Sequence, residues 1–211
     1  MPETDRRLGL LCVVSGPSGS GKTTLCKAAR REEGCQYSIS CTTRSPRSGE
    51  VDGEHYHFLT PEEFLARVEE GKFLEHATVH GNLYGTLRSS VEELLRQGRD
   101  VVMDIDVQGA ALVRACEDPL VKKCLVDVFV LPPSIKELAS RLSGRGTETQ
   151  EQLDLRMSNS IEEMAQWQDY GYTILSASVR KDFERFRAIL HAERQRSSRL
   201  DPKIASEIQT L

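Results

Sequence analysis

Short apolar runs recur along the chain at intervals that fit a buried sheet. The most apolar of them are typical of strands covered on both faces, and they span residues 10–15, 101–105 and 126–131. Further strands are predicted at residues 37–42, 55–59 and 172–175, with a strand pair at residues 73–84 around His80-Gly81-Asn82.

Amphipathic stretches between these runs predict helices. The clearest start is Thr60-Pro61-Glu62-Glu63, where Thr60 can cap, Pro61 suits the first helical position and Glu63 completes a capping box; Gly71 ends this helix. Other helices are predicted at residues 23–31, 90–98, 107–116, 134–142, 147–167 and 181–196. Strands that alternate with helices indicate an α/β fold with a mostly parallel central sheet flanked by helices.

Composition narrows the class of protein. The chain has 211 residues, of which 38% are hydrophobic, and a net charge of −4, which suits one folded domain. A pI near 5.8 argues against sequence-independent binding of nucleic acid, and no apolar run approaches the roughly 18 residues of a membrane span. The six cysteines form no C-x-x-C pair, so zinc is not expected. Scattered thiols without an export signal predict a cytoplasmic protein.

The segment after the first strand fits the phosphate-loop pattern G-x-x-x-x-G-K-[ST] in full, with an apolar strand before it and a helix after it. The predicted nucleotide-binding residues are Gly16, Pro17, Ser18, Gly19, Ser20, Gly21, Lys22, Thr23 and Thr24. Backbone N–H groups would cradle phosphates, Lys22 would reach the β- and γ-phosphates, and the Thr23 hydroxyl would hold Mg²⁺. The alternative is an ordinary Gly/Ser turn. The pattern predicts ATP-type chemistry and leaves the acceptor open.

Further motifs follow in a fixed order. They are Ser40-Cys41-Thr42-Thr43-Arg44-Ser45-Pro46-Arg47, Gly49-Glu50-Val51-Asp52-Gly53 with Tyr56, Phe73-Leu74-Glu75, Gly81-Asn82-Leu83-Tyr84-Gly85-Thr86, Asp104-Ile105-Asp106-Val107-Gln108-Gly109 and residues 141–149. Together with the phosphate loop, over residues 8–190, this series resembles guanylate kinase.

The resemblance implies a P-loop kinase fold with a small mixed β/α GMP-binding subdomain and a helical lid. It divides residues 8–190 into a core (8–36, 98–140 and 168–190), a GMP-binding region at about 37–90 and a lid at about 141–167, followed by a tail at 191–211. The implied reaction uses ATP and Mg²⁺ to phosphorylate GMP, and dGMP as well, in purine nucleotide metabolism. The oligomeric state stays open between monomer and homodimer.

For the acceptor, the resemblance places Arg44, Arg47, Tyr56 and Tyr84 around the phosphate of GMP. Arginine suits this role because its planar fork of donors matches phosphate oxygens. From the residues alone, a solvated basic turn with two structural tyrosines is the alternative.

For the base, the resemblance assigns the guanine edge to a carboxylate, which can accept hydrogen bonds side by side from N1–H and the N2 amino group. The implied base-site residues are Glu75, Ser40, Thr86 and Asp106, with Gly85 beside them. Asp104 resembles the acidic residue at the end of a Walker B strand, where ligands of α/β sheets gather. A helix N-cap is the alternative for Asp104.

For the lid, Gly144-Arg145-Gly146 indicates a hinge that carries a charge. The resemblance places Arg145 and its neighbours Arg141 and Arg156 at the transferring phosphoryl group, where they act with Lys22 and Arg44; plain surface arginines are the alternative. Ser176-Ala177-Ser178 departs from the family pattern, so no adenine contacts are assigned there.

Two competing functions remain at this stage. A non-catalytic guanylate-kinase-like binding module would carry a degraded phosphate loop, whereas this chain keeps Gly21-Lys22-Thr23. A P-loop kinase acting on a sugar phosphate would need no base-reading set built from Glu75, Tyr84 and Thr86.

Overall fold

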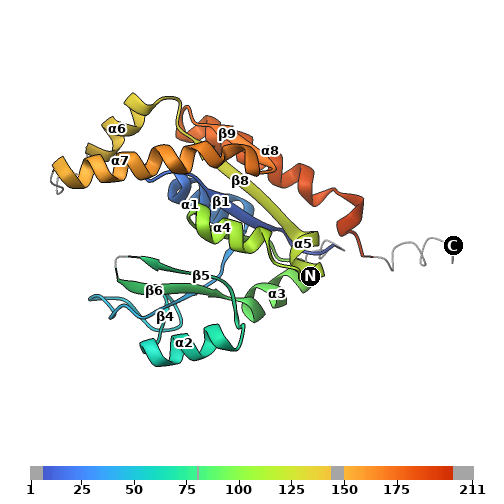
Figure 1. Cartoon of the computed structure of the whole chain (residues 1–211). Helices are drawn as coiled ribbons and strands as arrows, with labels where there is room; N and C mark the ends of the chain where they lie inside the picture. The colour runs from blue at the N-terminus through green and yellow to red at the C-terminus, as the bar shows by residue number, and fades with distance from the viewer. Residues whose placement is uncertain (1–6, 80, 144–149, 202–211) are drawn as a thin grey trace.

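Five parallel strands form the larger of two sheets, in the order β2-β7-β1-β8-β9 (Figure 1). The computed structural model describes residues 7–79, 81–143 and 150–201. The strands of this sheet are β1 (Leu11–Ser15), β2 (Gln36–Tyr37), β7 (Val101–Asp104), β8 (Leu125–Leu131) and β9 (Tyr172–Leu175). The predicted α/β fold with a parallel central sheet is therefore confirmed.

Alternate residues of β1 point to opposite faces of this sheet, and each face has its own core. Cys12 and Val14 pack on one side among residues of α1 and α8, while Leu11 and Val13 pack on the other among residues of α3 and α4. The helices that follow the large-sheet strands are α1 (Lys22–Glu33), α4 (Val107–Arg114), α5 (Pro119–Cys124), α6 (Ile135–Ser143), α7 (Gln150–Met164) and α8 (Val179–Arg194). Two 3₁₀ turns, at Ala165–Asp169 and Ser197–Arg199, complete this part.

The second sheet has four strands in the order β4-β3-β6-β5 and mixes parallel with antiparallel pairing. We call it the small sheet. Its elements are β3 (Ser40–Thr42), β4 (His57–Phe58), β5 (Phe73–Val79) and β6 (Asn82–Leu87), with α2 (Pro61–Glu69) and α3 (Arg88–Arg96) beside them. Cys41, Phe64 and Phe73 form its compact core, and the rings of Phe64 and Phe73 stack at 4.4 Å. In Figure 1 the small sheet lies apart from the large one, with α4 above β5.

Most predicted elements are present, including the capping box. Thr60 Oγ1 accepts from the backbone N–H of Glu63 at 3.2 Å, and the Glu63 carboxylate accepts from the backbone N–H of Thr60 at 3.0 Å. The single strand predicted at residues 37–42 is wrong, because Tyr37 pairs with Val102 of the large sheet whereas Ser40 pairs with Thr86 of the small one. The chain therefore crosses between the two sheets there.

Several helices differ from their predictions at their ends, and one helix was not predicted. α3 begins at Arg88 instead of Ser90, because β6 runs directly into it. α5 was not predicted, since six residues are too few to show a helical period; the Asp118 side chain caps its start. Among the described helices, none has the length and apolar character needed to cross a membrane.

Candidate active site

The phosphate loop connects β1 to α1 at the carboxyl edge of the large sheet. Gly16 has φ +140°, and a Cβ atom there would lie 2.4 Å from the carbonyl oxygen of Val130, so only glycine fits this position. Gly21 is the N-cap of α1 and provides no side-chain cap. The N–H groups of the first turn of α1 are consequently left for an anion, as at other phosphate-binding helix ends.

Lys22 reaches back over this loop. Its Nζ donates to the carbonyl oxygens of Gly16 at 2.5 Å and Pro17 at 3.0 Å. Burial lowers the pKa of the Lys22 ammonium, and the nearby carboxylate of Asp104 opposes that shift. The cation is thus held over the loop that would cradle the phosphates.

Thr23 and Asp104 meet although they are 81 positions apart in the chain. Thr23 Oγ1 donates to Asp104 Oδ2 at 2.5 Å, which brings two hard oxygen ligands together beside the phosphate loop. The alternative that Asp104 caps a helix is wrong, because Asp106 is the N-cap of α4 and accepts from the backbone N–H of Gly109 at 2.8 Å.

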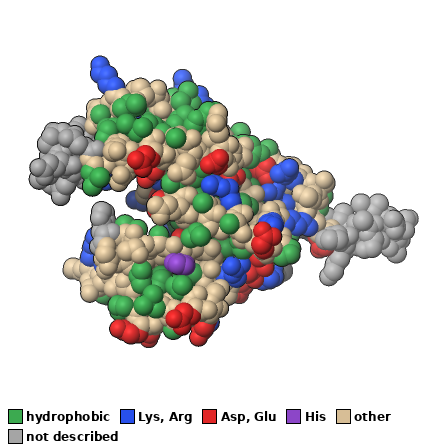
Figure 2. Space-filling model, viewed as in Figure 1, with side chains coloured by type: hydrophobic (Ala, Val, Ile, Leu, Met, Phe, Trp, Pro, Cys, Tyr) green, Lys and Arg blue, Asp and Glu red, His purple; other side chains and the backbone are tan. Residues whose placement is uncertain are grey.

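A cavity of about 440 Å³ covers the loop and includes Lys22, Thr23, Asp104 and Arg141 in its lining. A second cavity, of about 240 Å³, lies between the small sheet and the end of β7. Figure 2 shows this side of the molecule hollowed between the two parts, with basic side chains inside the hollow. Most predicted acceptor residues line the second cavity, namely Ser40, Tyr56, Glu75, Tyr84, Gly85, Asp104 and Asp106.

Glu75 lines that cavity and is itself buried. Its carboxylate is only 7% exposed and accepts a hydrogen bond from the Thr86 hydroxyl at 2.7 Å. Burial raises the pKa of the Glu75 carboxyl, and the Thr86 hydrogen bond opposes the shift only in part.

Gly109, in the first turn of α4, is a residue to which sequence reasoning gave no role. A Cβ atom there would lie 3.2 Å from Glu75 Oε2 and 3.3 Å from Asp106 Oδ1. Glycine therefore leaves room for the two carboxylates. The signal available in the sequence was the placement of Gly109 three residues after Asp106.

Arg44 is held in place by Glu50, a residue whose role the sequence did not indicate. The Arg44 guanidinium donates to both carboxylate oxygens of Glu50, at 2.9 and 3.0 Å, and lies 5.4 Å from the ring centroid of Tyr56. Hydrogen bonding to Arg44 lowers the pKa of Glu50. Tyr84 packs edge-on against Tyr56 at 6.1 Å. Neither Arg44 nor Arg47 is among the residues that line the cavity, and Arg47 is exposed.

Two predicted lid arginines reach the phosphate loop side. Arg156 of α7 donates to Ser18 Oγ at 3.1 Å. Arg141 of α6 donates to Glu137 at 3.1 Å and lies 3.5 Å from Ser176 Oγ. Arg145, with the rest of Gly144-Arg145-Gly146, lies outside the described residues.

A third cavity, of about 360 Å³, shares Gly19, Gly21, Thr24 and Arg141 with the phosphate cavity. Its far wall is the segment 176–179, to which the sequence reasoning assigned no contacts. Ser176 Oγ donates to Asp182 Oδ2 at 2.9 Å, and the backbone N–H of Ala177 donates to Asp182 Oδ1 at 2.9 Å. Asp182 is buried and was missed because it lies inside a helix, four residues beyond the loop that it holds.

Comparison with known proteins places this arrangement in a family. The family model described as "Guanylate kinase" matches residues 9–193. The chain belongs to the guanylate kinase family. It is 46% identical to the guanylate kinase of Clostridium perfringens (strain 13 / Type A) over 91% of this chain and 87% of that one. It is also 46% identical to the guanylate kinase of Paramagnetospirillum magneticum over 94% of this chain and 91% of that one.

A solved structure agrees with this family membership. The crystal structure of guanylate kinase from Anaplasma phagocytophilum matches with a TM-score of 0.71 at 29% identity, and the match covers 94% of this chain and 93% of that one. In this member of the guanylate kinase family, Asp104 lines both the phosphate-loop cavity and the cavity that contains Glu75. The individual residue roles remain predictions.

Proposed function

We infer that the protein transfers a phosphoryl group from ATP to GMP, forming ADP and GDP. One observation carries this function beyond family membership: Asp104 lines both the phosphate-loop cavity and the cavity that the buried Glu75 also lines. Two nucleotides bound in these cavities would have their phosphates face to face. That is the geometry a direct transfer requires.

Guanine would be read by Glu75. Guanine presents N1–H and an N2 amino group along one edge, and a carboxylate can accept from both. The Thr86 hydroxyl occupies one carboxylate oxygen and holds the group in place. Ser40 and Asp106, which line the same cavity, supply further polar groups around the base.

The GMP phosphate would be bound by Arg44, Tyr56 and Tyr84, with Arg47 joining from the surface of the same segment. A phosphate monoester has its second pKa near 6, so GMP is mostly a dianion at neutral pH and needs no general base. Catalysis then consists of positioning and charge neutralisation. Lys22, Arg141 and Arg156 would supply the positive charge on the ATP side, together with Arg145.

Mg²⁺ would be held through Thr23 and Asp104, whose oxygens already lie 2.5 Å apart. The fit is chemical, because a hydroxyl and a carboxylate are oxygen ligands that this ion prefers. When bound, the ion would supply positive charge that neutralises the phosphates.

The adenine of ATP would occupy the third cavity. Ser176 gives its hydroxyl proton to Asp182 and accepts from Arg141 at 3.5 Å, so its oxygen keeps one further lone pair as a hydrogen-bond acceptor beside the cavity. An acceptor there suits the N6 amino group of adenine. Residues 141–167 would act as a lid over ATP, with residues 37–90 as the GMP-binding region.

The test is ADP release with GMP, dGMP, AMP, CMP, UMP and dTMP as acceptors. We expect turnover with GMP and dGMP and only weak activity with the other four. Lys22→Ala should remove turnover while circular dichroism stays that of the wild type. Equal rates with AMP would overturn the substrate assignment. Phosphorylation of a sugar phosphate in place of GMP, or binding of GMP without turnover, would support one of the two competing functions.

A further inference from the structure

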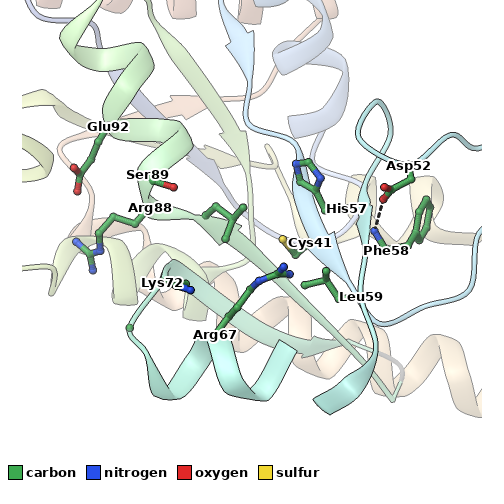
Figure 3. Close-up of a pocket in the computed structure, with 12 residues that line it drawn as sticks. Cys41, Asp52, His57, Phe58, Leu59, Arg67, Lys72, Arg88, Ser89 and Glu92 are labelled. Atoms are coloured by element: carbon green, nitrogen blue, oxygen red, sulfur yellow. Dashed lines mark hydrogen bonds between the residues drawn. The ribbon is translucent and has the colours of Figure 1, made fainter. Parts of the chain in front are cut away.

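A cavity of about 600 Å³ lies outside the nucleotide sites (Figure 3). It opens behind the small sheet, where α2 and the start of α3 flank β3, β4 and β6. Neighbouring residues of a strand point to opposite faces. Ser40 and Tyr56 line the cavity that contains Glu75, which we call the GMP cavity. The residues that follow them, Cys41 and His57, line this one. The two cavities therefore occupy opposite faces of one sheet.

Three cations from different elements line this rear cavity. Arg67 comes from α2, Lys72 from the turn after it and Arg88 from the start of α3. Lys72 pairs with Glu70, and Arg88 donates to the Cys116 thiol at 3.1 Å, which is a weak acceptor. Within the part of the chain that the structure describes, no hydrogen bond or ion pair engages the guanidinium of Arg67. Figure 3 shows its side chain extending toward Cys41 and Leu59.

The carboxylates of the same cavity already have partners. Asp52 accepts from the backbone N–H of Phe58 at 2.8 Å, and Glu92 pairs with Arg96 at 3.0 Å. In Figure 3 these two carboxylates lie at opposite ends of the cavity, with Arg67 and Lys72 between them. The centre of the cavity is therefore positively charged, and Arg67 offers several free donors to a ligand.

Part of the remaining wall is apolar. The side chains of Cys41, Phe58, Leu59 and Leu87 form this part, and the polar His57 and Ser89 line the cavity beside it. A volume of about 600 Å³ falls within the roughly 300–1,000 Å³ of small-molecule sites, which combine apolar walls with a few placed polar groups. A bare inorganic anion would leave that apolar wall uncovered.

We propose that this rear cavity is a binding site for a small phosphate monoester that carries an apolar or aromatic group. The phosphate contacts Arg67 and Lys72, with Arg88 at the rim, and the apolar group lies on Leu59 and Leu87. Two arginines and a lysine match a dianionic phosphate better than a singly charged carboxylate. Since the site is on the far face of the small sheet, its ligand binds at the same time as GMP.

The test uses phenyl phosphate as the probe, titrated into protein that is saturated with GMP and ADP, a pair that cannot react and that fills both nucleotide sites. NMR chemical shifts report where it binds. We expect the amide signals of Cys41, His57 and Leu87 to move. Inorganic phosphate lacks the buried ring and benzoate lacks a charge-assisted contact, so each should bind at least about tenfold more weakly than phenyl phosphate.

The charge variants decide the assignment. Arg67→Gln with Lys72→Gln should weaken phenyl phosphate binding at least about tenfold, in line with the loss of charge-assisted hydrogen bonds. Lys123→Gln on the exposed face of α5 removes a cation elsewhere and should leave binding unchanged. Both proteins should keep the wild-type kcat with GMP, which shows that they are folded. Unchanged affinity in the double variant, or shifts confined to residues of the GMP cavity, would overturn the proposal. Equal binding of inorganic phosphate would overturn the apolar part.

Discussion

Two buried carboxylates, one in the large-sheet core and one in the small sheet, have contrasting surroundings. Asp100 is 6% exposed and accepts from Arg7 at 2.7 and 3.2 Å, from Arg194 at 2.8 Å and from the backbone N–H of Leu10 at 2.9 Å. Glu75 is 7% exposed, yet Thr86 is its hydrogen-bond partner and no cation pairs with it among the described residues.

The difference distinguishes a buried carboxylate that is compensated within the fold from one that is left available to a ligand. Asp100 has two cations and a backbone donor, so its desolvation is compensated when the chain folds. Glu75 is desolvated without such compensation, and its free lone pairs face a cavity. We infer that folding leaves Glu75 under-satisfied so that the substrate can complete its hydrogen bonds. Each prediction below tests one side of this contrast.

The largest effect is expected from Glu75→Gln on GMP turnover. The amide has the same shape, but its NH₂ group replaces an acceptor and would face a guanine donor. Loss of a charge-assisted hydrogen bond and a buried unmatched donor together cost about 4 kcal/mol, so kcat/KM for GMP should fall about 10³-fold. Steady-state kinetics at several GMP concentrations would measure it.

AMP supplies the control for that experiment. Adenine offers neither N1–H nor an N2 amino group, so the slow reaction of AMP should change far less than that of GMP. The rate with GMP divided by the rate with AMP should therefore fall. If Glu75→Gln kept both full GMP activity and full rejection of AMP, guanine would be read by other residues, and the contrast with Asp100 would lose its functional half.

Asp100→Asn should have the next largest effect, this time on stability. Arg7 and Arg194 would each lose a buried carboxylate partner, although Arg194 keeps its ion pair with Glu33, and breaking buried pairs costs about 3 kcal/mol. For a chain of this size, Tm should fall by about 6–12 °C. Thermal unfolding measures the change in Tm. As the control, Glu32→Gln removes an exposed carboxylate paired with Arg31 and should alter the free energy of unfolding by less than about 0.5 kcal/mol. A normal Tm for Asp100→Asn would show that the network contributes little.

Asp100 and Glu75 also illustrate how much of the fold and of the site could be predicted from the sequence. The phosphate loop was predictable because its residues are contiguous and each glycine has a local reason, as the +140° φ of Gly16 shows. The parallel sheet followed from continuous apolar runs such as Leu11–Ser15. Glu75 was singled out only through the family resemblance, since nothing local to Phe73-Leu74-Glu75 indicates that its carboxylate is buried.

The features that could not be predicted from the sequence depend on contacts between segments that are distant along the chain. Thr23 meets Asp104, and Arg156 meets Ser18 across 138 positions. The change of sheet between Tyr37 and Ser40 depends on which strand each residue pairs with, which an alternating pattern does not record. Asp100 received no role for the same reason, because its partners Arg7 and Arg194 lie 93 and 94 positions away.

Gly109→Ala should displace the Glu75 carboxylate without removing any polar group from the site. The added Cβ would lie 3.2 Å from Glu75 Oε2, so the carboxylate must move by a few tenths of an ångström. We expect KM for GMP to rise about tenfold, equivalent to about 1.4 kcal/mol, while stability stays equal or increases because alanine favours a helix. Gly171→Ala, whose Cβ would approach Asp127 remote from both cavities, is the matched control and should leave KM unchanged. An unchanged KM in Gly109→Ala would show that the Glu75 site tolerates such shifts.

The smallest effect reverses the sign seen at Asp100: without GMP, Glu75→Gln should be more stable than the wild type. Replacing an under-compensated buried carboxylate by a neutral amide should raise the free energy of unfolding by about 1 kcal/mol at pH 7.5.

The pH dependence of this stability difference tests whether the buried charge of Glu75 is its cause. Burial raises the pKa of Glu75 in the folded protein, so the folded state binds the proton more tightly than the unfolded chain, where glutamate titrates near about 4.3. Wild-type stability contributed by this group is therefore fully present below that value and is lost as pH rises through the raised folded pKa. The stability advantage of Glu75→Gln should accordingly be greatest at neutral pH and disappear below about pH 4, where the wild-type carboxyl is also neutral. Urea unfolding of both proteins from pH 4 to 8 measures the difference directly. An advantage that stayed constant with pH, or a less stable variant at pH 7.5, would mean that Glu75 is as well compensated as Asp100 and that the contrast between them is wrong.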